Sequence, residues 1–369
     1  MPGAFAENIN KSQTKKRVLV APLDWGLGHA TRCIPVIRGL IEEGFDVLLG
    51  TDGTCAKLLA AEFPDLKILS LKGYGVRYSR QRRFFFIKML LQTGKIARAI
   101  KKEHRRLKKI IKENRVDIVI SDNRFGLYHK NVHCIFITHQ LFIKTGNAFT
   151  EKKAQKINYR FIRRFNECWV PDLPGNENLA GALSHPGEMP GIPVRYIGPL
   201  SRFIRSGKEK NINILAMISG PEPQRTIFEK VLTDQLQNMP GNNVLLRGLP
   251  EKNDPARNIY PKNLQVFDHL PASRLGDLVQ SAEIIVAASG YSTVMDLAAL
   301  QQHAILIPTP GQAEQEWLAK YLSEKKYCIS CERERFELNE QVNKFRSAKF
   351  TGYPGTGDLL LKDALRSLK

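Results

Sequence analysis

A short glycine-containing segment with a histidine directly after it carries the strongest chemical signal in the chain. Residues 24–32 read DWGLGHATR and follow the apolar run at 17–23. A buried strand that leads through glycines into a helix leaves backbone N–H groups bare, so the turn can approach an anion or a sugar closely. His29 is the first titratable side chain after the glycines, and it can take a proton from a molecule bound there. The structural alternative is a tight turn with a capping histidine.

Two segments in the second half of the chain place small residues where a phosphate could bind. Ser219 and Gly220 end an apolar run and precede a helix-like segment, so their backbone amides could hold phosphate oxygens. Residues 288–296 read ASGYSTVMD, and within them Ser289 and Gly290 precede another helix-like segment. A glycine lets the backbone approach a ligand. The structural alternative for both segments is an ordinary helix start.

Polar side chains that follow these turns could bind phosphate oxygens, ribose hydroxyls or sugar hydroxyls. Ser292 and Thr293 can contact phosphate, although either can also be a plain N-cap. Asp296 lies one turn into the same helix, where a carboxylate can accept hydrogen bonds from two ribose hydroxyls. Its alternative role is a favourable interaction with the helix N-terminus. Gln315 and Glu316, near the start of a later helix, could bind sugar hydroxyls, or they could simply lie on the surface.

The elements that must position these groups form two series of alternating strands and helices. The expected strands are rich in Val, Ile and Leu without alternation, as in parallel strands buried on both faces. They lie at 17–23, 45–50, 67–71, 116–121 and 132–138, and again at 211–218, 243–247, 264–267, 283–287 and 304–308. This pattern predicts an α/β protein with two doubly wound, Rossmann-like domains facing across a cleft.

Composition sets the expected domain boundaries and compartment. A chain of 369 residues suggests two domains, and a polar, basic segment at 198–211 reads as the linker. We therefore expect one domain at 1–203, a second at 204–348 and a C-terminal tail helix at 349–369. The six scattered cysteines and the absence of an apolar leader or spanning run predict a cytoplasmic protein.

The charge is strongly basic and locally concentrated. The formal net charge is +20, and residues 77–115 contain fifteen Lys or Arg against two acids, around the apolar patch FFFI and MLL. A basic helix with such a patch suits an anionic membrane surface, at the inner face of the membrane for a cytoplasmic protein. Nucleic acid ranks lower as a partner because no nucleic-acid-binding motif is visible. A solvated helix face is the structural alternative.

Three motifs together resemble a known family. The chain is similar to the GT-B glycosyltransferases of family 28, the group of the lipid-linked N-acetylglucosamine transferase of peptidoglycan synthesis. The resemblance covers most of the chain. It rests on Gly26-Leu27-Gly28-His29, on Ser289-Gly290 through Asp296 followed by Leu297-Ala298-Ala299, and on Pro308 through Gln315-Glu316.

The resemblance implies transfer of a sugar from a nucleoside-diphosphate donor, expected to be a UDP-sugar, with inversion at the anomeric carbon. The acceptor is expected to be a hydroxyl, on a lipid-linked or envelope glycan. The resemblance also implies that 1–203 is the acceptor-side domain and 204–348 the nucleotide-sugar donor domain. His29 is the candidate base, and Asp122, just after the strand at 116–121, could orient it, or could form only an Asx turn. Backbone amides at 219–220 and at the helix start 289–293, together with Gly28, would receive the donor, and Arg225 could assist.

No Asp-x-Asp pair suited to a phosphate-bound metal is present, so no metal or other cofactor is expected. The chain also departs from the family pattern: the glycine turn is shorter, prolines flank Glu222, and Asp296 and Glu316 replace a usual glutamate and glutamine. These departures leave the sugar and acceptor open. They also keep two alternatives: a nucleotide-sugar epimerase, and a non-catalytic basic binding protein on the same scaffold.

Overall fold

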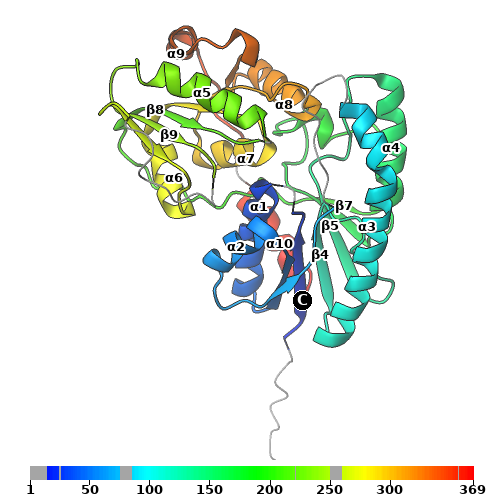
Figure 1. The fold of residues 1–369 in the computed structure, drawn as a ribbon. Helices are drawn as coiled ribbons and strands as arrows, with labels where there is room; N and C mark the ends of the chain where they lie inside the picture. Colours follow the sequence, from blue (N-terminus) through cyan, green and yellow to red (C-terminus); the bar gives the residue numbers. More distant parts are fainter. Residues whose placement is uncertain (1–14, 25, 75–84, 221, 250–259, 356) are drawn as a thin grey trace, which may run out of the picture.

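The structure is a computed structural model that describes every residue except 1–14, 25, 75–84, 221, 250–259 and 356, with the side chains of 85–93 and 358 also outside the description. Two parallel β-sheets, each with helices beside it, make up the molecule (Figure 1). The first sheet uses strands up to residue 196 and the second uses strands from 212 to 330. The predicted α/β class with two doubly wound domains is confirmed.

The first sheet has the strand order β3-β2-β1-β4-β5-β6-β7. Neighbouring strands are parallel throughout, which is the arrangement that helical crossovers produce. In this register Pro22 of β1 lies opposite Asp122 of β4, so the carboxyl ends of these two strands meet. The strands are β1 (Arg17–Pro22), β2 (Asp46–Thr51), β3 (Ile68–Ser70), β4 (Ile118–Asp122), β5 (His133–Ile137), β6 (Glu167–Val170) and β7 (Val194–Tyr196).

The second sheet has the order β10-β9-β8-β11-β12-β13, again with parallel neighbours. Ser219, Ser289 and Thr309 follow the adjacent strands β8, β11 and β12, so the three lie along one edge of this sheet. The strands are β8 (Ile212–Met217), β9 (Asn243–Leu246), β10 (Leu264–Phe267), β11 (Ala282–Ala287), β12 (Ala304–Leu306) and β13 (Ile329–Ser330).

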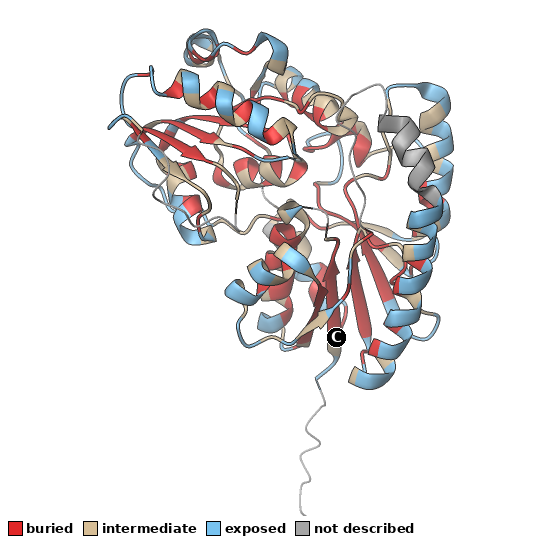
Figure 2. Ribbon diagram, in the orientation of Figure 1, coloured by how far each residue is buried: buried red, intermediate tan, exposed pale blue. Residues whose placement is uncertain are grey.

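Helices cover both faces of each sheet, which explains why the strand sequences do not alternate. On β1, Val18 and Val20 join the core formed with α1, whereas Leu19 and Ala21 join a separate core formed with α3. Figure 2 shows the central strands as continuously buried. The first-sheet helices are α1 (Leu27–Glu42), α2 (Gly53–Glu62), α3 (Phe85–Asn114) and α4 (Ala148–Ile162). The second-sheet helices are α5 (Gln224–Leu236), α6 (Ala272–Ser281), α7 (Tyr291–Leu300), α8 (Ala313–Glu324) and α9 (Leu338–Ser347).

One hydrophobic core runs through both halves of the molecule. It joins side chains of α1, such as Ile34, to side chains of α7, such as Val294, and α1 packs against α7 directly. The last helix, α10 (Asp358–Arg366), returns to α1, where Leu365 occupies the space that a Cβ on Gly39 would need. The C-terminal segment therefore packs on the helix that also carries His29.

The predicted boundary at 203/204 falls in the connection between β7 and β8 and stays a prediction. No helix was predicted at 148–162, because basic residues mask the weak apolar pattern of α4. This helix begins after its N-cap residue, Asn147. Among the described helices, none combines the length and hydrophobicity needed to cross a bilayer.

Candidate functional site

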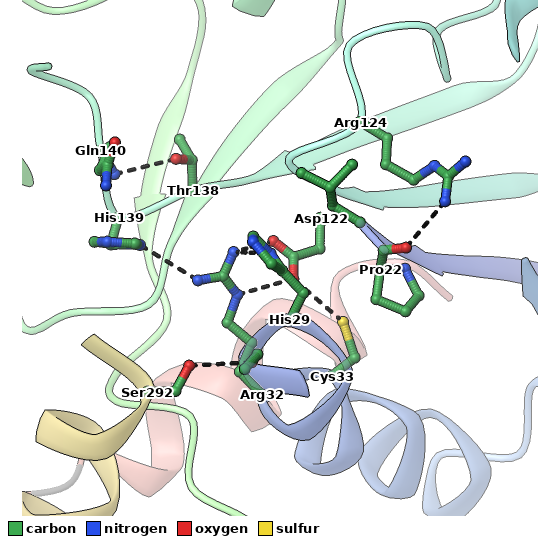
Figure 3. Close-up of polar contacts among 12 residues, drawn as sticks. Pro22, His29, Arg32, Cys33, Asp122, Arg124, Thr138, His139, Gln140 and Ser292 are labelled. Carbon is green, nitrogen blue, oxygen red and sulfur yellow. Dashed lines mark hydrogen bonds and ion pairs between the residues drawn. The ribbon is translucent and has the colours of Figure 1, made fainter. Parts of the chain in front are cut away.

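The candidate site begins where the first two central strands end. Asp122 is the last residue of β4, and its carbonyl accepts a hydrogen bond of 3.0 Å from the N–H of Leu23, just after β1. His29 lies in the first turn of α1, and its Nδ1 is 3.2 Å from Oδ2 of Asp122 (Figure 3). The two residues that the sequence selected as base and partner are therefore neighbours, although their chemical roles stay a prediction.

A buried arginine network fixes the backbone at this edge. The Arg124 guanidinium donates to the carbonyl of Pro22 at 3.1 Å (Figure 3). It also donates to the carbonyl of Leu71 at 3.0 Å. Its Nε donates to Oε1 of Glu103 on α3 at 2.6 Å, which neutralises the charge. Since Arg124 is fully buried, these bonds hold the ends of β1, β3 and β4 together. They therefore help to position Asp122, the last residue of β4.

Sequence analysis missed Arg32, which holds the Asp122 carboxylate. Arg32 Nε donates to Oδ2 of Asp122 at 2.8 Å, and Nη2 donates to Oδ1. Burial alone would raise the pKa of the Asp122 carboxyl, but the Arg32 guanidinium and His29 hold that pKa well below its usual range. Arg32 lies one helical turn after His29, and this i, i+3 spacing was the available signal.

The same guanidinium also touches the histidine, and this contact decides what the ring can do. Arg32 Nη2 lies 2.7 Å from His29 Nδ1. If Nδ1 accepts from Arg32, the ring proton sits on Nε2, which then cannot act as a base. If Nδ1–H donates to Asp122 instead, Nε2 is free to accept a proton. Burial lowers the pKa of His29, Arg32 lowers it further, and Asp122 opposes both, so the ring is neutral near pH 7.

A second histidine links this cluster to the other half of the molecule. His139, just after β5, lies with Nδ1 3.3 Å from Arg32 Nη1 and with Nε2 2.7 Å from Oε1 of Glu314 on α8. Its ring stacks on Tyr291 at the start of α7, with 4.2 Å between ring centres. Neither His139 nor Glu314 was selected from the sequence, because their contact depends on how the two sheets are placed relative to each other.

The N-terminus of α7, where phosphate binding is predicted, lies against the glycine-containing turn before α1. The Ser292 hydroxyl donates to the carbonyl of Gly28 at 3.0 Å (Figure 3). A Cβ on Gly28 would stand 2.8 Å from that hydroxyl, so a side chain there would require Ser292 to move. Gly290 is the N-cap of α7 and has open space beside it, and Thr293 is partly exposed. The structure thus brings Gly28, Gly290 and Ser292 close to His29.

Other predicted donor residues shape the loops behind this point. The Ser289 hydroxyl is buried and donates to the carbonyl of Gln315 at 2.8 Å. The Gln315 side chain accepts from the N–H of Thr309 at 2.9 Å, and Glu316 accepts from the N–H of Gly311 at 3.0 Å. Gln315 and Glu316 therefore hold the turn between β12 and α8, and their neighbour Glu314 is the residue that reaches the His29 cluster.

Asp296 lies farther along α7, against the connection between the two halves. Its Oδ1 accepts a hydrogen bond of 2.7 Å from the Ser201 hydroxyl. Burial raises the pKa of Asp296 to about 6, and the neighbouring Arg202 only partly offsets this. A ribose would have to displace or share the Ser201 contact, so the nucleotide role of Asp296 stays a prediction.

The loop after β8 contributes less than the sequence suggested. Ser219 is exposed, and Gly220 has a φ of 113°, a conformation that favours glycine. Arg225 is tied up within its own domain, donating to Glu222 and to Glu229 at 2.6 Å each. The structure therefore does not bring Arg225 to the His29 cluster, and its help with a leaving group stays a prediction.

One buried hydroxyl near that loop is without a partner. Thr309 Oγ1 forms no hydrogen bond among the described residues, and it lies 3.6 Å from where a Cβ on Gly220 would stand. A buried hydroxyl without a partner is costly, so a bound polar group is the natural way to satisfy it. Sequence analysis did not select Thr309. The described part of the chain holds no cluster of three or more His, Cys, Asp or Glu suited to a metal, and Cys328 and Cys331 are free thiols.

Sequence comparison relates the chain to glycosyltransferases. Residues 223–354 match the glycosyltransferase family 28 C-terminal domain. The chain is 24% identical over 334 residues to an uncharacterized glycosyltransferase of Methanosarcina acetivorans, covering 82% of each protein. It is 27% identical over 348 residues to the UDP-N-acetylglucosamine--N-acetylmuramyl-(pentapeptide) pyrophosphoryl-undecaprenol N-acetylglucosamine transferase of Actinobacillus pleuropneumoniae serotype 5b, covering 89% of this chain and 88% of that one. The predicted resemblance to family 28 is confirmed.

Solved structures with the same fold are also glycosyltransferases. A kitacinnamycin glycotransferase aligns with a TM-score of 0.62 at 15% identity over 96% of both chains. MurG of Acinetobacter baumannii aligns with a TM-score of 0.55 at 14% identity, covering 96% of this chain and all of that one, 100%. At such identities these neighbours establish the fold, which is the predicted GT-B architecture.

Replacing Arg32 by Met should lower the free energy of unfolding at pH 7 by about 3–5 kcal/mol, because it leaves a buried carboxylate unpaired. In the native chain the depressed pKa of Asp122 adds stability that is lost as pH falls through that pKa. In R32M burial would instead raise the pKa of Asp122, so the carboxylate is protonated more easily. The loss in free energy of unfolding relative to the native chain should therefore be smaller at pH 5 than at pH 7. Urea unfolding at both pH values measures this.

The double variant R32M/D122N is the control, because it removes the buried charge together with its partner. It should be more stable at pH 7 than R32M alone. A deficit of R32M that is equal at both pH values, with no recovery in the double variant, would contradict a stabilising ion pair.

Proposed function

We propose that this chain, a GT-B glycosyltransferase similar to family 28, transfers a sugar from a nucleoside-diphosphate donor to an acceptor hydroxyl with inversion at the anomeric carbon. The observation that carries the proposal is the meeting of His29 and Asp122 with the start of α7. A proton acceptor from one domain thereby lies next to a helix N-terminus from the domain that matches family 28.

His29 would act as the general base. In the tautomer with Nδ1–H directed at Asp122, the free Nε2 takes the proton of the acceptor hydroxyl as its oxygen attacks the anomeric carbon. The bond from that carbon to the diphosphate breaks, and its electron pair leaves with the diphosphate oxygen. Asp122 then stabilises the imidazolium ion, and Arg32 keeps the carboxylate in place. Attack from the face opposite the leaving group gives inversion.

The departing diphosphate would be held by the second domain. The α7 N-terminus, with Gly290, Ser292 and Thr293, offers bare N–H groups and a favourable dipole. Ser292 would exchange its present bond to Gly28 for one to a phosphate oxygen. The unpartnered Thr309 hydroxyl beside Gly220 supplies a further donor. Because these groups can carry the developing charge, we propose that transfer needs no divalent metal or other cofactor.

The relatives support one donor class and one acceptor class for the proposal. The Actinobacillus pleuropneumoniae relative is named for a UDP-N-acetylglucosamine donor and a pyrophosphoryl-undecaprenol acceptor. We carry over to this chain a UDP-sugar and a lipid-linked or glycan acceptor. Asp296, Gln315 and Glu316 remain the candidates for the ribose and the sugar, with Ser219 and Ser289 in the adjoining loops.

A basic and apolar face on α4 supports a peripheral position at an anionic membrane surface. Phe149 and Ile157 are 67% and 58% exposed, and Lys153 lies over the Phe149 ring at 4.2 Å. Arg160 is exposed a further turn along, so this α4 face combines cations with apolar side chains. The apolar residues near 84–91 lie outside the described side chains. We propose that the enzyme is cytoplasmic and binds at the inner face of the membrane.

His29→Ala should lower turnover by about 10²–10⁴-fold while leaving donor affinity unchanged, since only the attack step needs the base. Transfer is assayed with a panel of UDP-sugars and short polyprenyl-diphosphate-linked acceptors, and donor binding by isothermal titration calorimetry. Native-like turnover in H29A would remove His29 from the role. An altered sugar formed from the donor alone would support an epimerase. A lack of donor binding would support a non-catalytic protein.

Transfer should continue at its full rate in excess chelator, because helix amides and hydroxyls neutralise the leaving group. The comparison is initial rate with and without EDTA, on protein dialysed against the chelator beforehand. Activity that is lost in EDTA and restored by Mg²⁺ or Mn²⁺ would overturn the metal-independent proposal.

The double variant Lys153→Glu/Arg160→Glu should weaken binding to phosphatidylglycerol vesicles by about tenfold or more, because each cation near an anionic surface contributes about 1 kcal/mol. Flotation with phosphatidylglycerol and with phosphatidylcholine vesicles measures this. Lys230→Glu/Lys262→Glu makes the same charge change on exposed residues of the second domain and should bind like the native chain. Equal losses in both double variants would indicate only a net-charge effect.

A further inference from the structure

A chain of polar contacts crosses from the second domain to the candidate base. It runs from Glu314 on α8 through His139 and Arg32 to His29, with contacts of 2.7, 3.3 and 2.7 Å. The His139 and Arg32 side chains are 6% and 3% exposed, so water has little access to this path. Figure 3 shows His139 reaching Arg32 from the side opposite His29 and Asp122.

The donors and acceptors along this path fit one arrangement. The Glu314 carboxylate can only accept, so the proton of His139 sits on Nε2 and points at Oε1. His139 Nδ1 then carries a lone pair, which accepts from Arg32 Nη1. Stacking of the His139 ring on Tyr291 fixes the plane in which both bonds form. The carboxylate of the second domain therefore pulls on one edge of the guanidinium.

The other edge of that guanidinium competes for the candidate base. When Arg32 Nη2 donates to His29 Nδ1, the ring is locked in the tautomer whose Nε2 is already protonated. The base-competent tautomer needs Nδ1–H on Asp122, with Arg32 turned away from Nδ1. A hydrogen bond from Nη1 to His139 draws positive charge toward that edge of the guanidinium and weakens the donation from Nη2 to Nδ1, which favours the second arrangement.

We propose that Glu314 is a positioning residue for His29: through His139 and Arg32 it shifts the ring toward the base-competent tautomer while the second domain is docked. This inference rests on the proposed function, in which His29 takes the acceptor proton. Movement of α8 away from the first domain would break the His139 contact and strengthen the contact of 2.7 Å that Arg32 Nη2 already makes with His29 Nδ1. The arrangement thereby couples the position of the donor-binding half to the chemistry.

The remaining groups around His29 do not change charge near neutral pH. Burial raises the pKa of Cys33 on α1 and of Tyr291 on α7 well above their ordinary values, so both stay neutral. Arg32 stays protonated, and Asp122 on β4 stays ionised because Arg32 and His29 outweigh the effect of burial on its pKa. The path from α8 is therefore the variable element at this ring.

The test replaces Glu314 by Gln, which keeps the shape and a carbonyl acceptor but removes the charge. The pKa of His29 is measured by NMR titration of histidine-labelled protein, with H29A identifying its signal among the eight histidines. We expect E314Q to lower the His29 pKa by roughly 0.5 unit or more. Glu324→Gln removes the same charge from the exposed end of α8 and should leave the His29 pKa unchanged. An equal His29 pKa in native protein and E314Q would overturn the proposal.

A second background tests the route. His139→Asn removes the ring that joins Glu314 to Arg32, so adding E314Q to H139N should shift the His29 pKa by much less than adding it to the native chain. The same shift in both backgrounds would mean that Glu314 acts without His139, which contradicts the path.

The activity readout separates this inference from the proposed function. The acidic limb of the kcat–pH profile reports deprotonation of the base, so E314Q should move that limb to lower pH and reduce the plateau kcat. A raised donor KM with an unmoved limb would make Glu314 a donor contact only. Native-like turnover of H29A would contradict the proposed role of His29 as base. The change in the His29 pKa on E314Q substitution would still decide whether Glu314 acts on His29.

Discussion

The buried ion pair between Arg32 and Asp122 is the contact on which the rest of the site depends. Taking either charge out of water alone would be prohibitive, so each is tolerated only because the other is bound to it in a two-pronged geometry. The pair joins α1 to the end of β4, and it sets the charge beside His29, whose Nδ1 lies within reach of both Arg32 and Asp122. Structure and chemistry are therefore coupled through one guanidinium.

Helix α1 carries this pair and also joins the parts of the fold. It packs on α2, on the C-terminal helix α10 and on α7 of the second domain, within one continuous hydrophobic core. Because close packing leaves little room for sliding, the first turn of α1 is held within reach of α7. The contact between Gly28 and Ser292 shows how close this approach is, since a Cβ on Gly28 would stand 2.8 Å from the Ser292 hydroxyl.

The basic residues of the chain serve different purposes in different places. Arg32 and Arg124 are buried and fully matched by Asp122, Glu103 and backbone carbonyls, so they serve the fold and the site. Cations on α4 such as Lys153 and Arg160 are exposed beside apolar side chains. The second group is available to an anionic surface, and the first is not.

Sequence alone determined the alternation of buried parallel strands and helices, because strands covered on both faces lack polar alternation. It also placed His29 and Asp122 at strand ends of one sheet edge, where parallel topology brings them together. It could not give the path from Glu314 through His139, because residues 175 positions apart meet only when two domains are docked. It also could not show that Arg225 is held by its own helix, since side-chain partners depend on packing. The order of strands, turns and helices depends on local sequence, whereas contacts between domains form only when the chain adopts its tertiary structure.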